Sequence, residues 1–250
     1  MKKILNLYKK VGWTPLETIE RFKLKNPVYK NKRMGYAGRL DPMAEGVLLV
    51  LADEENKKIS QYMGFDKEYT AEFILGFSSD SNDVLGIAEN GKIDNEIDEK
   101  ELKKKIKGFV GKYEQKIPKY SSYKIKGKPM FHYARKGIKI EDVKKNVIIK
   151  KVKVNSIYQI GNSRLLKYIV SKINKVKGDF RQEDIVNNWN KLLKEDKKYH
   201  VLNITLSVSS GTYIRAIADD FGSEYGGGLL LSLKRTKVGK FDIKKSLKIR

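Results

Sequence analysis

The chain has 250 residues, no cysteine and a net charge of +23, from 53 Lys and Arg against 30 Asp and Glu. This length can bury a substantial core as one large domain or two small ones, and the 40% hydrophobic content excludes a disordered basic tail. Without cysteine there is no disulfide, thiolate nucleophile or zinc finger. The positive charge favours a polyanionic partner, nucleic acid first, although an anionic membrane surface also fits.

Other absences narrow the chemistry. His132 and His200 are the only histidines, which disfavours a Ser-His-Asp arrangement or a multi-histidine metal site. No GxxxxGK[ST] phosphate loop is present. The longest apolar run, residues 47–52, is far below the roughly 20 residues that cross a bilayer, and the N-terminus lacks the apolar stretch of a signal peptide. We expect a cytoplasmic protein whose chemistry, if any, uses carboxylates, tyrosine, lysine or arginine.

In chain order, the first third predicts short strands separated by helices. Thr14-Pro15 is typical of a helix start, with a capping threonine, proline at the first helical position and Glu17 three residues after the cap. The apolar alternation after Tyr69 is that of a strand with one buried face. The expected elements are a strand at 4–8, a helix from Thr14, a buried strand at 47–52, a helix at 54–63 and a strand at 69–77.

The rest of the chain mixes the two structures without regular alternation. Apolar residues recur at helical spacing in 214–221. The expected elements are a polar loop at 78–83, helices at 98–107 and 128–136, strands at 147–158 and 201–207, a helix at 214–221 and a strand at 229–233. This order favours an α+β fold with a mixed or antiparallel central sheet and flanking helices.

Residues 162–198 differ in composition from their surroundings. They are mostly charged and polar, and Trp189 with Leu192 and Leu193 predicts one amphipathic helix. Because a strand pattern resumes at Val201, we interpret the segment as a basic helical insertion within a single catalytic domain spanning 1–250. The alternative is an ordinary solvated part of the main domain.

Residues 35–42, Gly-Tyr-Ala-Gly-Arg-Leu-Asp-Pro, place the carboxylate of Asp41 on a short loop before the buried strand. The glycines allow left-handed backbone or close approach to a ligand, and Pro42 biases Asp41 towards an extended conformation. Taken alone, Asp-Pro is more often an ordinary turn than a catalytic loop.

Four sequence blocks support the interpretation of Asp41 as a catalytic residue. The first comprises Gly35, Gly38, Leu40, Asp41, Pro42, Ala44, Gly46, Val47 and Leu48; the second Lys67, Tyr69, Leu75, Gly76, Asp80, Ser81, Asp83 and Gly86. The third comprises Tyr120, Ser121, Lys124, Gly127, Pro129, Phe131, Tyr133, Ala134, Arg135 and Gly137; the fourth Ser210 to Arg215, Asp219, Asp220 and Gly222. In this order, and over about residues 4–241, the chain resembles the TruB family of tRNA pseudouridine synthases.

The resemblance implies the pseudouridine synthase fold and isomerisation of the T-loop uridine, position 55 of tRNA, without a cofactor or guide RNA. It assigns Asp41 to glycosidic chemistry, as nucleophile or base, since such chemistry needs a carboxylate beside a cationic sugar centre. Arg215 would pair with Asp41, although an exposed i,i+4 pair with Asp219 is the alternative. Tyr69 would stack on the flipped uracil, or simply pack in the core.

The resemblance also assigns substrate or RNA binding to five residues, namely Lys9, Tyr36, Lys124, Tyr213 and Leu233. For Tyr213 and Leu233, core packing is the alternative. Tyr36 replaces the family histidine, a residue near the target base, and the N-terminal K-P-x-G pattern loses its proline at Lys10. Many members continue into an RNA-binding PUA domain; we expect none here, and a monomer that binds the tRNA T-arm.

Three other functions compete with tRNA pseudouridylation. A binding module or RNA chaperone could keep the fold without turnover. A guide-dependent, dyskerin-like synthase would share the motifs but should carry the additional C-terminal domain. A magnesium nuclease using Asp41, Asp80 and Asp83 is the weakest alternative, because the Asp-Ser-x-Asp spacing also fits a structural loop of the family.

Overall fold

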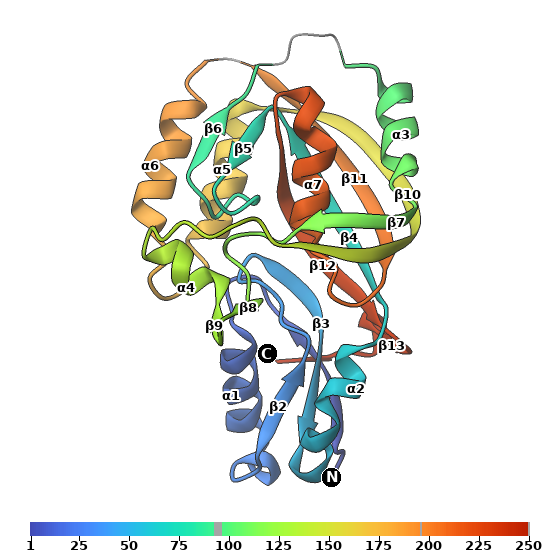
Figure 1. Cartoon of the computed structure of the whole chain (residues 1–250). Coiled ribbons are helices and arrows are strands. Elements are labelled where there is room, and N and C mark those ends of the chain that lie inside the picture. Colours follow the sequence, from blue (N-terminus) through green and yellow to red (C-terminus); the bar gives the residue numbers. More distant parts are fainter. Residues whose placement is uncertain (93–96, 196, 250) are drawn as a thin grey trace.

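A computed structural model of the chain describes residues 1–92, 97–195 and 197–249. Its main feature is a ten-stranded mixed sheet with the order β14-β1-β3-β12-β4-β11-β10-β7, to which β13 adds beside β12 and β2 beside β3 (Figure 1). The strands are β1 (Ile4–Lys9), β2 (Met34–Ala37), β3 (Ala44–Ala52), β4 (Lys67–Leu75), β7 (Gly111–Lys116), β10 (Lys144–Gly161), β11 (Lys198–Val208), β12 (Gly228–Val238), β13 (Phe241–Asp242) and β14 (Leu247–Lys248).

The sheet is mixed because two of its pairings are parallel. β12 runs parallel to β3, with Leu233 opposite Ala44, and β14 runs parallel to β1. The neighbouring long pairs are antiparallel, including β4 with both β11 and β12. Two short hairpins stand apart from this sheet: β5 (Phe77–Ser79) with β6 (Ala88–Asn90), and β8 (Lys124–Ile125) with β9 (Lys128–Pro129). The expectation of an α+β fold with a mixed sheet is confirmed.

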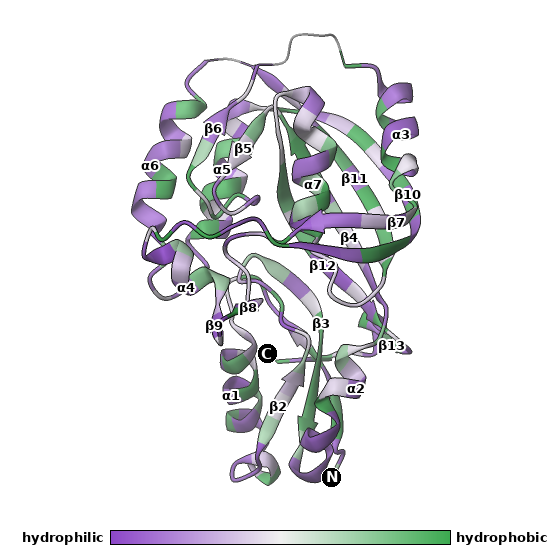
Figure 2. Cartoon of the chain, viewed as in Figure 1, coloured by the Kyte–Doolittle hydropathy of each residue, from purple (hydrophilic) through white to green (hydrophobic). Residues whose placement is uncertain are grey.

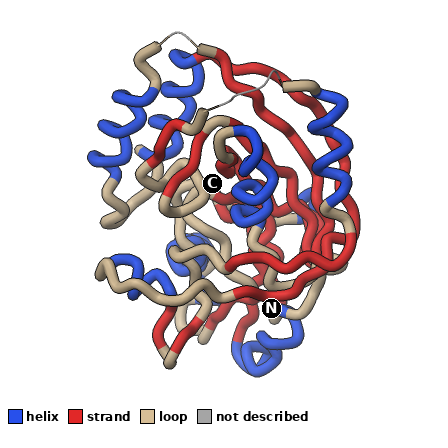
Figure 3. The backbone as a smooth tube through the Cα atoms, turned by 45° about the horizontal axis from the view of Figure 1, so that its top comes forward, coloured by secondary structure: helices blue, strands red, loops and turns tan. Residues whose placement is uncertain are grey.

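Seven α-helices flank the sheet in the described part of the chain (Figure 3). They are α1 (Pro15–Lys25), α2 (Ile59–Met63), α3 (Glu99–Gly108), α4 (Met130–Arg135), α5 (Asn162–Ile173), α6 (Gln182–Leu192) and α7 (Ile214–Gly222). None of these helices is long and apolar enough to cross a membrane. At the start of α1, Thr14 Oγ1 accepts a hydrogen bond from the Glu17 amide (3.0 Å), as its sequence indicates.

Hydrophobic residues concentrate on the central strands, whereas α3 and α6 carry hydrophobic and hydrophilic stripes (Figure 2). The largest buried cluster joins β4, β11 and β12 to α7 and α3, through Phe73, Leu206 and Phe221 among others. β3 is buried along nearly its whole length, between α1 on one face and α2 on the other. The site described below therefore stands on strands that are fixed by packing on both sides.

Two predicted helices differ in detail from the structure. The helix expected at 54–63 begins as a 3₁₀-helix, Asp53–Lys58, and only Ile59–Met63 is α-helical; neither piece has a fully buried side chain to hold a longer α-helix. The helix expected from Lys128 begins at Met130, because Lys128 and Pro129 pair with β8. The strand expected to reach Phe77 is interrupted at Gly76, whose φ is 90°.

Within the segment 162–198, α5 and α6 are integral to the core. Trp189 is fully buried, packs on Phe77 with ring centroids 5.1 Å apart, and donates through Nε1 to the Val84 carbonyl (3.2 Å). The apolar face of α5 is buried in the same cluster through Ile169 and Ile173. Composition predicted a basic helical insertion, with a solvated part of the main domain as the alternative, because the polar residues outnumber these few apolar positions. Because its removal would uncover Phe77 and its neighbours, we expect deletion of the segment to destabilise the fold.

Candidate active site

Asp41 lies on the loop between β2 and β3, and the sequence of this loop explains its shape. Gly38 has a φ of 81°, in the left-handed region that favours glycine. After Pro42, the Ala44 amide donates to the Asp41 carbonyl (3.0 Å) and closes a tight turn into β3. The Asp41 side chain remains 36% exposed, so its carboxylate is available to a ligand.

Arg215 holds this carboxylate from the first turn of α7. Its Nε lies 3.0 Å from Asp41 Oδ2, and its side chain is only 4% exposed. The other two nitrogens are also used: Nη1 donates to the Ser81 carbonyl (2.7 Å) and Nη2 to the Tyr120 carbonyl (3.3 Å). The guanidinium is thus fixed on three sides, and the predicted pairing with Asp41, rather than with Asp219, is what the structure contains.

Asp83 completes the charge balance around Arg215. Its Oδ2 lies 3.8 Å from Arg215 Nε, while its Oδ1 accepts from Ser81 Oγ (2.7 Å) and from the Leu85 amide (2.9 Å). Burial raises the pKa of the Asp83 carboxyl, and the Arg215 charge opposes that shift. Burial disfavours the Arg215 guanidinium, but Asp41 and Asp83 outweigh this effect and raise its pKa. Arg215 therefore stays charged beside Asp41.

A cavity of about 350 Å³ opens at Asp41 and Arg215. Tyr69 from β4, Leu233 from β12 and Tyr213 before α7 line it, which brings together five of the predicted site residues. Tyr69 is 7% exposed and Leu233 9%, so both pack in the core while presenting part of a side chain to the cavity. Packing and pocket lining, which the sequence left as alternatives, coincide at these two positions.

Two buried cations that hold the Asp41 loop complete the site. Arg235 is 1% exposed; its Nε donates to the Val47 carbonyl (2.8 Å) and its Nη2 to the Gly38 carbonyl (3.0 Å). Sequence reasoning missed Arg235. The available signal was its spacing of two residues from Leu233 in a strand, which places a charge on a buried face. Arg235 lines the cavity beside Tyr69, the residue with which it is paired between the adjacent strands β12 and β4.

The second cation is Lys9, for which the structure differs from the predicted RNA contact. Lys9 is fully buried beneath the loop, and Nζ donates to the carbonyls of Ala44 (2.5 Å), Lys10 (3.1 Å) and Pro42 (3.4 Å). Burial lowers the pKa of Lys9 to about 7, although Asp41 acts in the opposite direction. Its side chain cannot reach RNA and instead supports the loop from below.

Tyr36 and Lys124 lie outside this cavity. Tyr36 is half-buried on β2 and packs with the cluster of Leu7, Ile19 and Leu48, on the α1 side of β3. Lys124 is exposed on the β8–β9 hairpin. The sequence alone could not show on which face of the sheet Tyr36 lies, because that depends on which strand pairs with β2.

The acidic pair considered for magnesium has other uses. Asp80 Oδ1 accepts from the Ile87 amide (3.0 Å), and its Oδ2 accepts from Arg181 Nη2 (2.8 Å). Asp83 is taken by Ser81, Leu85 and Arg215. Both carboxylates therefore shape the 79–87 loop, as the alternative reading of the Asp-Ser-x-Asp spacing indicated.

Known proteins are similar to this chain along most of its length. Residues 26–178 match the TruB family pseudouridylate synthase N-terminal domain. The tRNA pseudouridine synthase B of Endomicrobium trichonymphae is 31% identical over 250 residues, which cover 99% of this chain and 89% of the relative. That of Caldanaerobacter subterraneus is 32% identical over 245 residues, covering 97% and 71%. For the Lactococcus lactis relative, at 28% identity, this chain spans 64% of the length.

Solved structures support the fold. A chain of a Cbf5-Nop10-Gar1 complex superposes with a TM-score of 0.61 at 17% identity, covering 98% of this chain and 51% of the other. A chain of an H/ACA RNP bound to a substrate RNA superposes with a TM-score of 0.58 at 16% identity, covering 98% and 50%. With the family match over residues 26–178 and relatives at 31–32% identity, the chain belongs to the TruB family of pseudouridine synthases.

Proposed function

We propose that this protein converts the T-loop uridine of tRNA, position 55, to pseudouridine without a guide RNA. The observation that carries the proposal is the pairing of Asp41 with Arg215 at 3.0 Å on the rim of the cavity that Tyr69 and Leu233 line. The names of the relatives, which are tRNA pseudouridine synthases, support tRNA as the substrate.

The reaction breaks the bond between C1′ and N1, rotates the uracil and forms a bond between C1′ and C5 of the same nucleotide; C5 loses its proton to solvent or a nearby base, and N1 gains one. A cationic sugar centre or a proton on the sugar needs a nearby carboxylate. We assign this role to Asp41, acting as nucleophile or as base, and Arg215 keeps the carboxylate ionised and oriented. Because Arg215 also binds two backbone carbonyls, the orientation is set before substrate arrives.

The target base must leave its stack to reach Asp41, which costs a few kcal/mol. We assign Tyr69 to stacking on the flipped uracil, with Leu233 and Tyr213 shaping the rest of the cavity. These apolar side chains lie beside charged ones, among them Lys67, Lys145 and Arg235, so the lining offers both a stacking surface and polar groups to a uridine.

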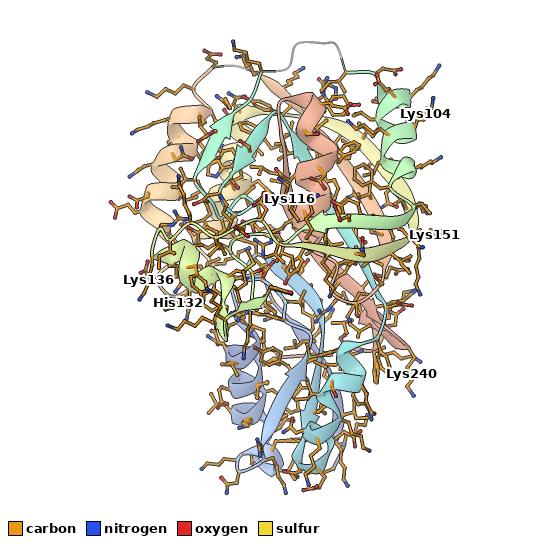
Figure 4. All side chains as sticks on the ribbon, in the orientation of Figure 1. Lys104, Lys116, His132, Lys136, Lys151 and Lys240 are labelled. Atoms are coloured by element: carbon orange, nitrogen blue, oxygen red, sulfur yellow. The ribbon has the colours of Figure 1, made fainter. Side chains whose placement is uncertain are left out.

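Positive charge attracts the RNA to the protein. Lys104, Lys136, Lys151 and Lys240 point outward from separate parts of the fold (Figure 4), so the net charge of +23 is spread over the molecule. Such a field raises the association rate of a polyanion. We propose that residues 162–198, with their basic side chains, add to the RNA contacts of one catalytic domain spanning 1–250.

The decisive experiment maps pseudouridine in an unmodified tRNA transcript, incubated with purified protein and no guide RNA. We expect modification at position 55 and none in a transcript carrying cytidine there. Asp41→Asn should lower the rate at least a thousandfold, about 4 kcal/mol of barrier, while tRNA affinity stays within a few-fold of wild type. Asp142→Asn, at an exposed carboxylate paired with Lys116, is the matched control.

Two outcomes would refute this proposal. If Asp41→Asn retains a tenth of the wild-type rate, Asp41 does not have the assigned role. If the wild-type protein binds tRNA tightly but forms no pseudouridine, the chain is a binding module that keeps the fold without turnover.

A further inference from the structure

A cavity of about 540 Å³, which we call the Glu72 cavity, lies on the opposite face of the main sheet from the catalytic cavity. β4 separates the two, because side chains three residues apart on a strand point to opposite faces. Tyr69 lines the catalytic cavity, and Glu72 lines the other. The volume falls within the range of about 300–1,000 Å³ that is usual for small-ligand sites. The proposed reaction gives the Glu72 cavity no role.

The Glu72 carboxylate has two acceptor positions that are only weakly used. Its Oε1 accepts from the Tyr158 hydroxyl at 3.0 Å and from Asn203 Nδ2 at 3.5 Å. Its Oε2 accepts from Ser232 Oγ at 2.6 Å and from the Tyr168 hydroxyl at 3.3 Å. Each oxygen therefore has one short hydrogen bond and one long, weaker one. A ligand with two adjacent N–H donors can replace the long bonds and bind both oxygens at once.

Aromatic and aliphatic side chains form the walls around this carboxylate. Tyr158 on β10 and Tyr168 on α5 are half-buried, and Ile160 and Leu231 are buried. Burial raises the pKa of both hydroxyls, that of Tyr168 to about 12, and the Glu72 charge adds to the rise. Both tyrosines therefore remain protonated donors. Such rings and apolar surfaces bind flat heterocycles.

Arg164 brings a positive charge to the same cavity. It lies in the first turn of α5 and is exposed. In the described part of the chain, no carboxylate lies within ion-pair distance of Arg164, so its guanidinium is available to a phosphate. Its charge also disfavours a ligand such as free arginine, which has the fork of donors that Glu72 can accept but is itself a cation.

We propose that the Glu72 cavity binds a guanosine 5′-nucleotide. Guanine carries N1–H and its 2-amino group side by side, and this is the donor pair that the two oxygens of Glu72 can accept. Adenine, cytosine and uracil lack such a pair on their Watson–Crick edges. The guanine ring packs against Tyr158, and the phosphate reaches Arg164. This inference does not rest on the proposed function, since the site lies on the other face of the sheet from Asp41.

The test is titration calorimetry of the full chain with guanosine monophosphate (GMP). The comparison ligands are inosine monophosphate (IMP), which lacks the 2-amino group, guanosine, which lacks the phosphate, and adenosine monophosphate (AMP). The proteins are wild type, Glu72→Gln, Arg164→Met and Glu68→Gln. Glu68 is the matched control, because it is a half-buried carboxylate on the same face of β4. Thermal melting checks that each variant is folded.

We expect wild type to bind GMP with a Kd of about 10 μM, from the usual affinity per non-hydrogen atom of a ligand. IMP should bind about tenfold more weakly, because it leaves one oxygen of a charged acceptor without its new donor, and AMP should bind more weakly still. Arg164→Met should weaken GMP about tenfold and leave guanosine unaffected, since Arg164 acts on the phosphate alone.

Glu72→Gln should exchange the base preference. Its amide offers one acceptor and one donor group in place of two acceptors. The variant should therefore lose GMP and gain xanthosine monophosphate, in which a carbonyl oxygen replaces the 2-amino group. Glu68→Gln should bind GMP as wild type does.

The proposal is overturned if wild type shows no saturable binding of GMP up to about 1 mM, or if IMP and AMP bind as tightly as GMP. It is also overturned if Glu72→Gln binds GMP like wild type, which would place the nucleotide elsewhere. If Glu72→Gln does not fold, the ranking of GMP against IMP and the response of Arg164→Met decide in its place. None of these measurements uses turnover, so a failure of the proposed pseudouridylation leaves their outcome unaffected.

Discussion

The loop that carries Asp41 and the segment that lies over it, residues 119–137, are held in opposite ways. Arg235 and Lys9, both buried, bind the loop's carbonyls from two sides, and β3 continues it into the core. The covering segment is mostly exposed, and its hairpin, β8–β9, forms no strand pairs with the main sheet. Its ties to the body include the bond from Arg215 to the Tyr120 carbonyl and the stacking of Arg181 on Tyr120, at 5.3 Å.

The firmly held loop keeps Asp41 preorganised, whereas the weakly held segment over it can give access to the site. A carboxylate that must act on one atom of a sugar benefits from a backbone that cannot move, because reorientation would otherwise add to the barrier. The segment 119–137 contributes Ser121 and Tyr123 to the cavity at Asp41, and Phe131 to a second cavity that shares lining residues with it. Under the proposed function we expect the RNA to enter past this segment, and low local stability of the segment would allow that entry.

The largest effect is expected where the Asp41 strand touches β12. A Cβ added to Gly46 would lie 2.2 Å from the Arg235 carbonyl oxygen, at a φ of 113°. Gly46→Ala should therefore lower the free energy of unfolding by about 4 kcal/mol, from overpacking and backbone strain together, as measured by urea denaturation. Gly111→Ala is the matched control, since Gly111 has a φ of 123° but nothing within 4 Å of the added Cβ.

The contrast between these two variants isolates the contact from the strain. Gly111→Ala should lose only the strain component, roughly 1–3 kcal/mol. Equal losses in both variants would mean that β3 and β12 separate easily, and that the Asp41 loop is not rigidly held.

The next effect concerns Lys9, whose buried amine has a pKa of about 7. The unfolded chain keeps the ordinary value of 10.5, so it binds more protons than the folded protein between pH 7 and 10.5. Stability should consequently rise with pH across this window. Relative to Lys9→Met, the wild-type free energy of unfolding should increase by about 2–3 kcal/mol from pH 7.5 to 9.5, at up to about 1.4 kcal/mol per pH unit.

Urea denaturation at the two pH values measures this difference. Lys67, whose pKa burial lowers to about 8, contributes to both proteins and cancels in the comparison. Lys151→Met, at an exposed lysine on β10 (Figure 4), should leave the pH dependence as in wild type. If Lys9→Met keeps the wild-type pH dependence, burial does not lower the pKa of Lys9, and the amine keeps its charge beneath the loop.

The same contrast shows what could be predicted from sequence. Asp41, Tyr69 and Arg215 were identified because their motif blocks follow the order of a known family, and the structure brings all three to one cavity. The supporting cations were not: Arg235 and the burial of Lys9 depend on β12 pairing with β3 across almost 190 residues, for which a single sequence carries no direct signal.

In the α5–α6 segment, prediction from composition failed for a different reason. Its composition is polar, yet Trp189 and the apolar face of α5 pack against Phe77 and the strands. Only a few positions in each helix need to be apolar to bury one stripe, so an average over residues 162–198 conceals them. Whether such a helix pair is solvated or packed depends on the surface that the rest of the fold offers.

The smallest effect is expected in the covering segment. Arg181→Ala removes the ion pair with Asp80 at 2.8 Å, in which both side chains are more than 30% exposed, and the stacking on Tyr120. Each is worth about 1 kcal/mol or less, so global stability should hardly change. Amide hydrogen exchange within residues 119–137 should become several-fold faster, while amides of β3 and β4 keep their protection.

Lys144→Ala, which breaks an exposed pair with Glu114 at 2.7 Å, is the matched control and should leave exchange at 119–137 unaltered. Because the ties that Arg181 makes are few and exposed, their loss should be felt locally. Unchanged exchange at 119–137 in Arg181→Ala would show that the contacts of Arg181 do not hold this segment.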